Sequence, residues 1–192
     1  MTESLAYTGN KANNYDKKRE NTNKWKKENH AVAELIGTLE EIKTVLDVPI
    51  GTGRFIPGYK ALGWEVTGVD LSPDMLRIAK ERGCDHCAIG DIRNLKVEAE
   101  NVPEVFDLSV CIRLTNWLSP ADLKKAVQSL ANVSRYQIIG IRTQPKYQPK
   151  GRLHKHSLSH FLACLESAGL VIKERRAIKE GSYSIYLCEP NF

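Results

Sequence analysis

The stretch Val45–Phe55 reads VLDVPIGTGRF and joins an apolar, strand-like run directly to a turn that contains two glycines. Gly51 and Gly53 carry no Cβ atom, so a ligand can approach the backbone closely at this turn. In open α/β sheets, ligands bind beyond the carboxyl ends of the strands, and the first strand–helix turn is the usual place. The stretch therefore predicts a ligand site at the end of the first strand of an α/β sheet.

Strand and helix signals alternate along the rest of the chain. Strands are expected at 43–48, 65–70, 86–90, 106–112 and 137–143, and helices at 23–39, after Gly53, at 72–83, 119–133 and 157–168. Residues 144–156 are expected to form a basic loop, and 170–178 with 182–190 a closing hairpin. This order predicts a mostly parallel sheet with helices on both faces and an antiparallel strand near the C-terminus.

Length and composition fit a single globular domain over residues 1–192, with a polar leader at 1–22 that is expected to cover the ligand. No apolar run approaches the ~18 residues of a membrane span. The first residues lack the apolar core of a signal peptide, so a cytoplasmic location is expected. The single C-x-x-C, Cys84 and Cys87, has no second pair at zinc-site spacing, so neither a metal site nor a disulfide scaffold is expected.

The glycine turn departs from the two commonest nucleotide-binding patterns. A G-x-G-x-x-G fingerprint that begins at Gly51 would need glycine at position 56, where Ile56 stands, and no Gly-Lys-Ser/Thr follows the turn. The ligand is therefore expected to lack a diphosphate. Asp70 ends the second strand, and a carboxylate in that place can accept hydrogen bonds from both hydroxyls of a ribose. A nucleoside without phosphates points to S-adenosyl-L-methionine.

These residues make the chain resemble the class I, Rossmann-like S-adenosylmethionine-dependent methyltransferases. The first motif of that family, D/E-x-G-x-G-x-G, is matched from Asp47 to Gly53, and later motifs by Asp70, Asp91 and Phe106–Leu118. The resemblance covers about residues 12–190. It implies a Rossmann-like three-layer sandwich with a seven-stranded sheet, and S-adenosyl-L-methionine as cofactor. Pro49 takes the first glycine position, so the close approach must rest on the two remaining glycines.

The resemblance also implies a set of cofactor-binding residues: Tyr15, Arg19, Trp25, Asp47, Gly51, Gly53, Asp70, Leu71, Met75, Asp91, Ile92 and Cys111. Asp47 and the glycines would face the methionine part, and Cys111 the methyl group.

Five of these residues have a purely structural alternative. Met75 would pack on the adenine or simply in the core, and Asp91 would accept from the adenine amino group or cap a helix. Tyr15 and Arg19 would hold the cofactor carboxylate or belong to a charged leader, and Trp25 could equally anchor the first helix.

Four residues are candidates for the chemistry. Arg113 and Asn116 follow the fourth strand, and His154 and His156 follow the fifth. Arg113 would bind an anionic acceptor or form a surface ion pair. A histidine can act as a base near neutral pH, or it can be a solvated or helix-capping residue. A base is needed only if the acceptor loses a proton during the attack.

The acceptor is expected to be a small molecule that receives the methyl group on oxygen or nitrogen by in-line transfer. No Asn/Asp-Pro-Pro-Tyr/Phe or Pro-Cys motif follows the fourth strand, so methylation of nucleic acid bases is not favoured, although the net charge of +5 is compatible with a nucleic-acid partner. Two alternatives stay open: a same-fold enzyme that transfers the aminocarboxypropyl arm, cleaves or cyclises the cofactor, and a non-enzymatic binding module. No oligomeric state is indicated.

Overall fold

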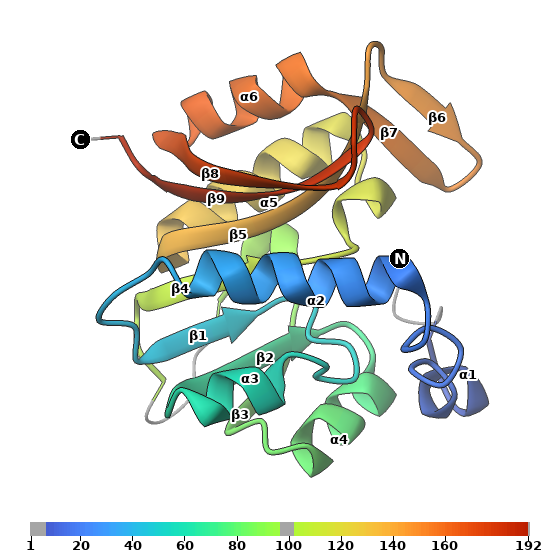
Figure 1. The fold of residues 1–192 in the computed structure, drawn as a ribbon, viewed down its shortest axis with the longest axis vertical. Helices are drawn as coiled ribbons and strands as arrows, with labels where there is room; N and C mark the ends of the chain where they lie inside the picture. The colour runs from blue at the N-terminus through green and yellow to red at the C-terminus, as the bar shows by residue number, and fades with distance from the viewer. Residues whose placement is uncertain (1–6, 97–101, 192) are drawn as a thin grey trace.

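The computed structural model describes residues 7–96 and 102–191. A twisted sheet forms its middle layer, with helices on both faces (Figure 1). Its parallel strands are β1 Thr44–Asp47, β2 Glu65–Asp70, β3 His86–Ile89, β4 Phe106–Cys111 and β5 Ser134–Gln144. The hairpin β8 Leu170–Lys179 and β9 Tyr183–Pro190 joins the edge of β5 antiparallel. The order β3-β2-β1-β4-β5-β9-β8 confirms the predicted Rossmann-like arrangement, but the sheet of the described residues has nine strands and not the seven predicted.

The two additional strands lie where no strand was predicted. Residues 144–156 were expected to form a loop, but they contain a second hairpin of β6 Gln148–Lys150 and β7 Leu153–Ser157. The reason is the length of β5. Its pairing with β9 ends at Arg142, and the exposed edge that remains at Thr143 and Gln144 pairs in parallel with β7. In Figure 1 this hairpin and the N-terminal segment lie at the same edge of the molecule, the edge toward which β1 points.

The helices lie where the capping signals predicted them. Helices α2 Asn23–Ile36, α3 Ile56–Ala61 and α4 Pro73–Glu81 pack on one face of the sheet, and α5 Pro120–Val133 and α6 Leu158–Ser167 on the other. The hydroxyl groups of Ser72 and Ser119 accept hydrogen bonds from the N–H groups three residues further on, and each is followed by a proline at the first helical position. Short turns of helix complete the chain: α1 Asn10–Asn13, η2 Ile92–Asn94 and η3 Thr115–Trp117.

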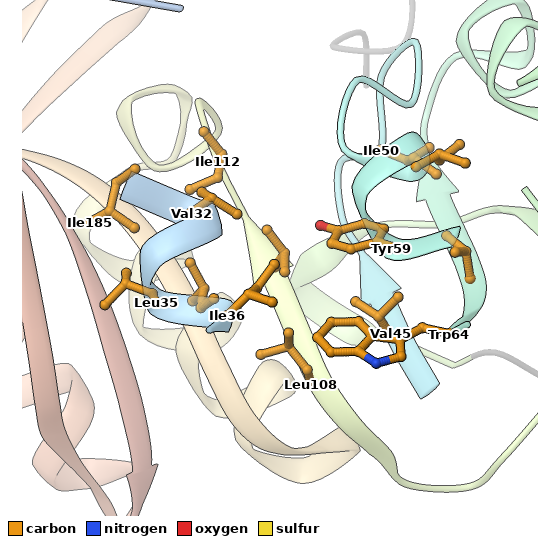
Figure 2. Packing of buried hydrophobic residues seen from close by; sticks show 14 of the residues in the cluster. Val32, Leu35, Ile36, Val45, Ile50, Tyr59, Trp64, Leu108, Ile112 and Ile185 are labelled. Carbon is orange, nitrogen blue, oxygen red and sulfur yellow. The ribbon is translucent and has the colours of Figure 1, made fainter. Parts of the chain in front are cut away.

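Two apolar clusters hold the layers together. In the cluster of Figure 2, Val32 and Leu35 of α2 pack toward the sheet, and the rings of Tyr59 and Trp64 stack beside Val45 of β1 with centroids 6.0 Å apart. The second cluster joins α5 and α6 to the opposite face. Helices cover both faces of the sheet, whereas loops surround the carboxyl edge of its parallel strands.

Two negative findings concern residues 7–96 and 102–191 only. No helix in these ranges has both the length and the apolar character needed to cross a membrane. No group of three or more His, Cys, Asp or Glu side chains is placed there to hold a metal ion. Sγ of Cys84 lies within hydrogen-bond distance of the carbonyl oxygens of Val66 and His86, to either of which its one S–H can donate, and the thiol of Cys87 donates to the carbonyl of Leu76.

Candidate functional site

A cavity of about 510 Å³ opens at the carboxyl ends of the parallel strands. The turns after β1, β2, β3 and β4 supply its walls, together with the N-terminal segment, the start of α5 and the β6–β7 hairpin (residues 148–157). The stretch Asp47–Thr52 lines it without a break. The glycine turn therefore lies where the sequence predicted a ligand site.

The two glycines of the turn have different tasks. Both have positive φ angles, +56° at Gly51 and +76° at Gly53. A Cβ atom on Gly51 would meet no protein atom within 4 Å, and Gly51 lines the cavity. A Cβ atom on Gly53 would lie 2.3 Å from Cδ1 of Ile56, and Gly53 is not part of the wall. Gly51 thus keeps space open for a ligand, whereas Gly53 lets α3 pack closely. Pro49 lines the cavity after a cis peptide bond.

Backbone N–H groups fix the carboxylate of Asp70 in the cavity wall. Its Oδ2 accepts from the N–H of Gly51 at 3.0 Å and its Oδ1 from the N–H of Ser72 at 2.9 Å. Burial raises the pKa of Asp70, although these hydrogen bonds partly oppose that shift. Each oxygen still has a lone pair for another donor. The carboxylate can therefore accept from two neighbouring hydroxyl groups.

Asp47 lies deeper in the same wall. Its side chain is buried, and Oδ2 accepts a hydrogen bond from the hydroxyl of Tyr59 at 3.3 Å. Burial raises the pKa of Asp47 to about 7. The carboxyl group is therefore about half ionised near pH 7, and a cation in the cavity would favour the ionised form.

The turns after β2 and β3 supply an apolar surface beside a carboxylate. Leu71, Met75 and Ile92 line the cavity, and Met75 is also buried in the protein. Asp91 lines the cavity and at the same time caps η2, because its Oδ1 accepts from the N–H of Arg93 at 2.9 Å. Hydrogen bonds from the Arg93 side chain hold the pKa of Asp91 below its usual range. The two interpretations offered for Met75 and Asp91 are thus compatible with each other.

The N-terminal segment covers one side of the cavity. Tyr7 and Tyr15 line it, with their rings in an edge-to-face contact at a centroid distance of 5.2 Å. The side chain of Asp16 accepts a hydrogen bond from the hydroxyl of Thr52 at 2.7 Å and so ties the segment to the glycine turn. The guanidinium of Arg19 stacks on Tyr15 and does not line the cavity. Trp25 is buried at the start of α2, outside the wall.

A buried carboxylate that the sequence analysis did not single out organises the next part of the wall. Glu28 of α2 is fully buried, and its Oε2 lies 2.9 Å from Nη1 of Arg54 and 2.7 Å from Nε of Arg113. The hydroxyl of Tyr183 donates to its Oε1 at 2.8 Å. Burial acts to raise the pKa of Glu28, but the charges of the two arginines outweigh it, so the pKa is lowered. Glu28 is therefore a carboxylate at neutral pH.

Both arginines bound by Glu28 line the cavity. Their guanidinium groups also lie over the indole ring of Trp25, 4.5 Å from its centroid for Arg54 and 5.1 Å for Arg113. A signal for this cluster exists in the sequence. Glu28 falls on the apolar stripe of α2 between Trp25 and Val32, where a charged residue needs a partner.

The far end of the cavity is formed by Leu114, Trp117, Arg152 and His154. The hydroxyl of Tyr147 lies 2.6 Å from Nδ1 of His154.

The other candidates for chemistry lie elsewhere. Asn116 belongs to η3 but is not in the wall, and Cys111 is buried in the core beneath α5. His156 is fully buried, and its Nε2–H donates to the carbonyl of Thr115 at 2.9 Å. Burial lowers the pKa of His156, so its ring is held neutral. Of the four candidates, Arg113 and His154 reach the cavity.

Comparison with known proteins agrees with this geometry. A family model described as "Methyltransferase domain" matches residues 45–137. The chain is 34% identical over 104 residues to a ubiquinone biosynthesis O-methyltransferase of Nitrosomonas europaea, a match that covers 53% of this chain and 43% of that protein. It is 34% identical over 99 residues to a malonyl-[acyl-carrier protein] O-methyltransferase of Salmonella typhimurium, covering 51% and 37%. The chain thus spans less than half the length of these curated relatives.

Solved structures share the fold. An S-adenosylmethionine-dependent methyltransferase from Clostridium acetobutylicum superposes with a TM-score of 0.72 at 19% identity, covering 94% of this chain and 98% of that one. A magnesium protoporphyrin IX methyltransferase from Synechocystis with bound S-adenosylmethionine gives 0.68 at 14% identity, covering 87% and 80%. Together with the family model, these matches confirm the resemblance seen in the motifs. Residues 45–137 thus match a methyltransferase domain, and the chain has the Rossmann-like fold of the class I S-adenosylmethionine-dependent methyltransferases.

Proposed function

We propose that this protein transfers the methyl group of S-adenosyl-L-methionine to an oxygen or nitrogen atom of a small-molecule acceptor. The observation that carries the proposal is one continuous cavity with two chemically different ends. The glycine turn, Asp47 and Asp70 lie at one end, and Trp117 and His154 at the other. The names of the curated relatives, which are O-methyltransferases, favour oxygen as the acceptor atom.

The residues at the first end fit the cofactor. The open space beside Gly51 admits a ligand to the backbone, and the free lone pairs of Asp70 suit the two ribose hydroxyls. Leu71 and Met75 would hold the adenine, with Asp91 and the N–H of Ile92 at its polar edge.

Charged groups further along the wall suit the methionine part. Asp47 would pair with the ammonium group. The guanidinium groups of Arg54 and Arg113 lie in the wall, where they can bind the carboxylate, and Glu28 positions both of them. Arg19, the residue predicted for this task, lies outside the wall. Arg54 and Arg113 are therefore proposed in its place.

When bound, the cofactor supplies a methyl group activated by the sulfonium. The protein's own contribution is to hold the acceptor in line and to exclude water, which supplies much of the acceleration in such displacements. In the tautomer in which Nδ1–H of His154 donates to the hydroxyl oxygen of Tyr147, Nε2 carries no proton and can take one from an acceptor hydroxyl. His156 cannot share this task, because it is buried and its Nε2–H is bound to Thr115.

The test is product analysis after incubation with S-adenosylmethionine and a set of small phenols, carboxylic acids and amines. Methyl transfer yields S-adenosylhomocysteine and a methylated acceptor. Methylthioadenosine would show that the cofactor is used for another reaction and would refute the proposal, as would a failure to bind the cofactor.

A matched pair of variants tests the cofactor site. Asp70→Asn is expected to weaken cofactor binding by about 1.5–3 kcal/mol, because charge-assisted hydrogen bonds to the ribose are lost. Asp85→Asn makes the same chemical change outside the cavity, where the carboxylate accepts from the N–H of Val66, and should leave cofactor affinity unchanged.

A further inference from the structure

Most charged side chains of the cavity are separated by sign along the carboxyl edge of the sheet, although Asp122 of α5, which follows β4, also lines the cavity. The strand order β3-β2-β1-β4-β5-β7 places Asp91 and Asp70 at one end, after β3 and β2. Arg113 follows β4, and Arg152 directly precedes β7 at the other end. The cavity is thus acidic where the nucleoside is proposed to bind and basic where the acceptor must enter.

The arginine side chains that line the cavity are not equivalent. Arg54 and Arg113 share the buried carboxylate of Glu28, so part of their charge is neutralised within the protein. Arg152 also lines the cavity, but its side chain has no hydrogen-bond or ion-pair partner within residues 7–96 and 102–191. A guanidinium group at the wall of a cavity is therefore left for a ligand.

The sequence around Arg152 contains no acidic side chain that could neutralise its charge. Residues 142–165 contain Arg142, Lys146, Lys150, Arg152 and Lys155 and no aspartate or glutamate. A cleft lined by charges of one sign concentrates ligands of the opposite sign.

The neighbours of Arg152 at this end limit what kind of anion fits. Leu114 and Trp117 supply an apolar and aromatic wall, and His154 is the polar group next to them. A planar guanidinium group matches a carboxylate with two parallel hydrogen bonds. An organic acid with an apolar or aromatic body fits this combination better than a bare inorganic anion.

We propose that the methyl acceptor carries a carboxylate group and that Arg152, presented by the β6–β7 hairpin, binds it. The inference rests on the proposed function, because it names the acceptor class of the same cavity. It makes the hairpin the element that determines acceptor specificity.

A binding experiment tests the subsite without requiring the natural acceptor. Protein loaded with S-adenosylhomocysteine is titrated with benzoate and with benzamide, a neutral molecule of nearly the same shape. We expect benzoate to bind about 10- to 100-fold more tightly than benzamide, the range of a charge-assisted hydrogen-bonded pair. Arg152→Met should abolish the difference, and Arg152→Lys should retain part of it.

Arg135→Met is the matched control. It removes the same charge at the opposite end of β5, where Arg135 lies over the ring of Tyr136, and it should keep the preference for benzoate. Equal affinity for the two probes, or a preference that survives Arg152→Met, would overturn the inference. So would salt-sensitive binding of a single-stranded RNA that Arg152→Met weakens while benzoate binding stays unchanged.

Affinity for S-adenosylhomocysteine separates this inference from the proposed function. It should be the same in the wild type, Arg152→Met and Arg135→Met. If the wild type fails to bind S-adenosylhomocysteine, the proposed function falls, whereas the comparison of benzoate with benzamide can still be made on the protein alone.

Discussion

Cofactor affinity is expected to rise with pH on the acid side of neutrality because of Asp47. Burial raises the pKa of this carboxyl to about 7, so the protein without ligand carries a proton there at pH 5. An ammonium group beside Asp47 favours the ionised form, so binding must release that proton. Since a lower pH makes the proton harder to release, affinity falls as the pH falls below 7.

The size of the effect follows from the titration. A carboxyl group with a pKa of about 7 is ionised in roughly 1% of molecules at pH 5 and in half of them at pH 7. A ligand that binds only the ionised form therefore gains about fifty-fold in affinity across this range, or ~2.3 kcal/mol. The measurement stops at pH 7 because the amino group of the ligand loses its proton at higher pH. An ordinary α-amino group has a pKa of about 7.7–8.0.

The assay is isothermal titration with S-adenosylhomocysteine at pH 5, 6 and 7. Asp47→Asn should bind more weakly at pH 7 and lose most of the slope, although Asp70, whose pKa burial also raises, keeps a smaller part of it. Asp107→Asn, near the amino end of β4, should keep the full slope. A flat wild-type profile, or an unchanged slope in Asp47→Asn, would refute the pairing of Asp47 with the ammonium group.

Three further predictions concern stability and the cover of the cavity. Gly53→Ala should lower the free energy of unfolding by about 2 kcal/mol or more, because its Cβ would overlap Ile56. Gly51→Ala should lower the free energy of unfolding by about 1 kcal/mol and mainly weaken cofactor binding. Chemical denaturation measures the first effect, and calorimetry with the cofactor measures the second. Glu28→Gln should destabilise the fold by about 3 kcal/mol at neutral pH. The folded protein holds the pKa of Glu28 below its ordinary 4.5, so the wild type should keep its whole stability advantage over Glu28→Gln above pH 4.5 and lose it as the pH falls further. Denaturation of both proteins at several pH values measures this. Asp16→Ala should speed limited proteolysis of the N-terminal segment with little change in global stability, since it removes the hydrogen bond to the glycine turn; an unchanged cleavage rate would argue against that tie.

The sheet could be predicted from the sequence because its signals are local. Apolar runs of strand length, and helix starts such as Ser72 and Ser119 with their prolines, fix most elements before any tertiary contact is known. The β6–β7 hairpin was not predicted in this way. Its residues are mainly basic and polar, and what makes them a strand is the free edge that β5 leaves beyond Arg142.

The same distinction applies to the site. Gly51, Asp70 and Asp91 could be placed together because parallel strands bring their carboxyl ends to one edge, so spacing along the chain was enough. Tyr15 and Arg19 stand in one short segment, yet only Tyr15 reaches the cavity, because the direction of each side chain depends on how the segment folds back. The spacing of residues along the chain does not predict the direction of a side chain, so these directions are seen only in the structure.

Glu28 links two turns of the site that are far apart in the sequence. Arg113 has a φ angle of +68°, a left-handed conformation that costs a non-glycine residue of the order of 1–3 kcal/mol unless its surroundings hold it. Here the surroundings are the ion pair with Glu28 and the face of Trp25, both on α2. The same carboxylate binds Arg54, which directly follows the glycine turn. The positions of the turns after β1 and β4 are therefore coupled through one buried group, so a change at Glu28 must disturb both turns of the cavity wall together.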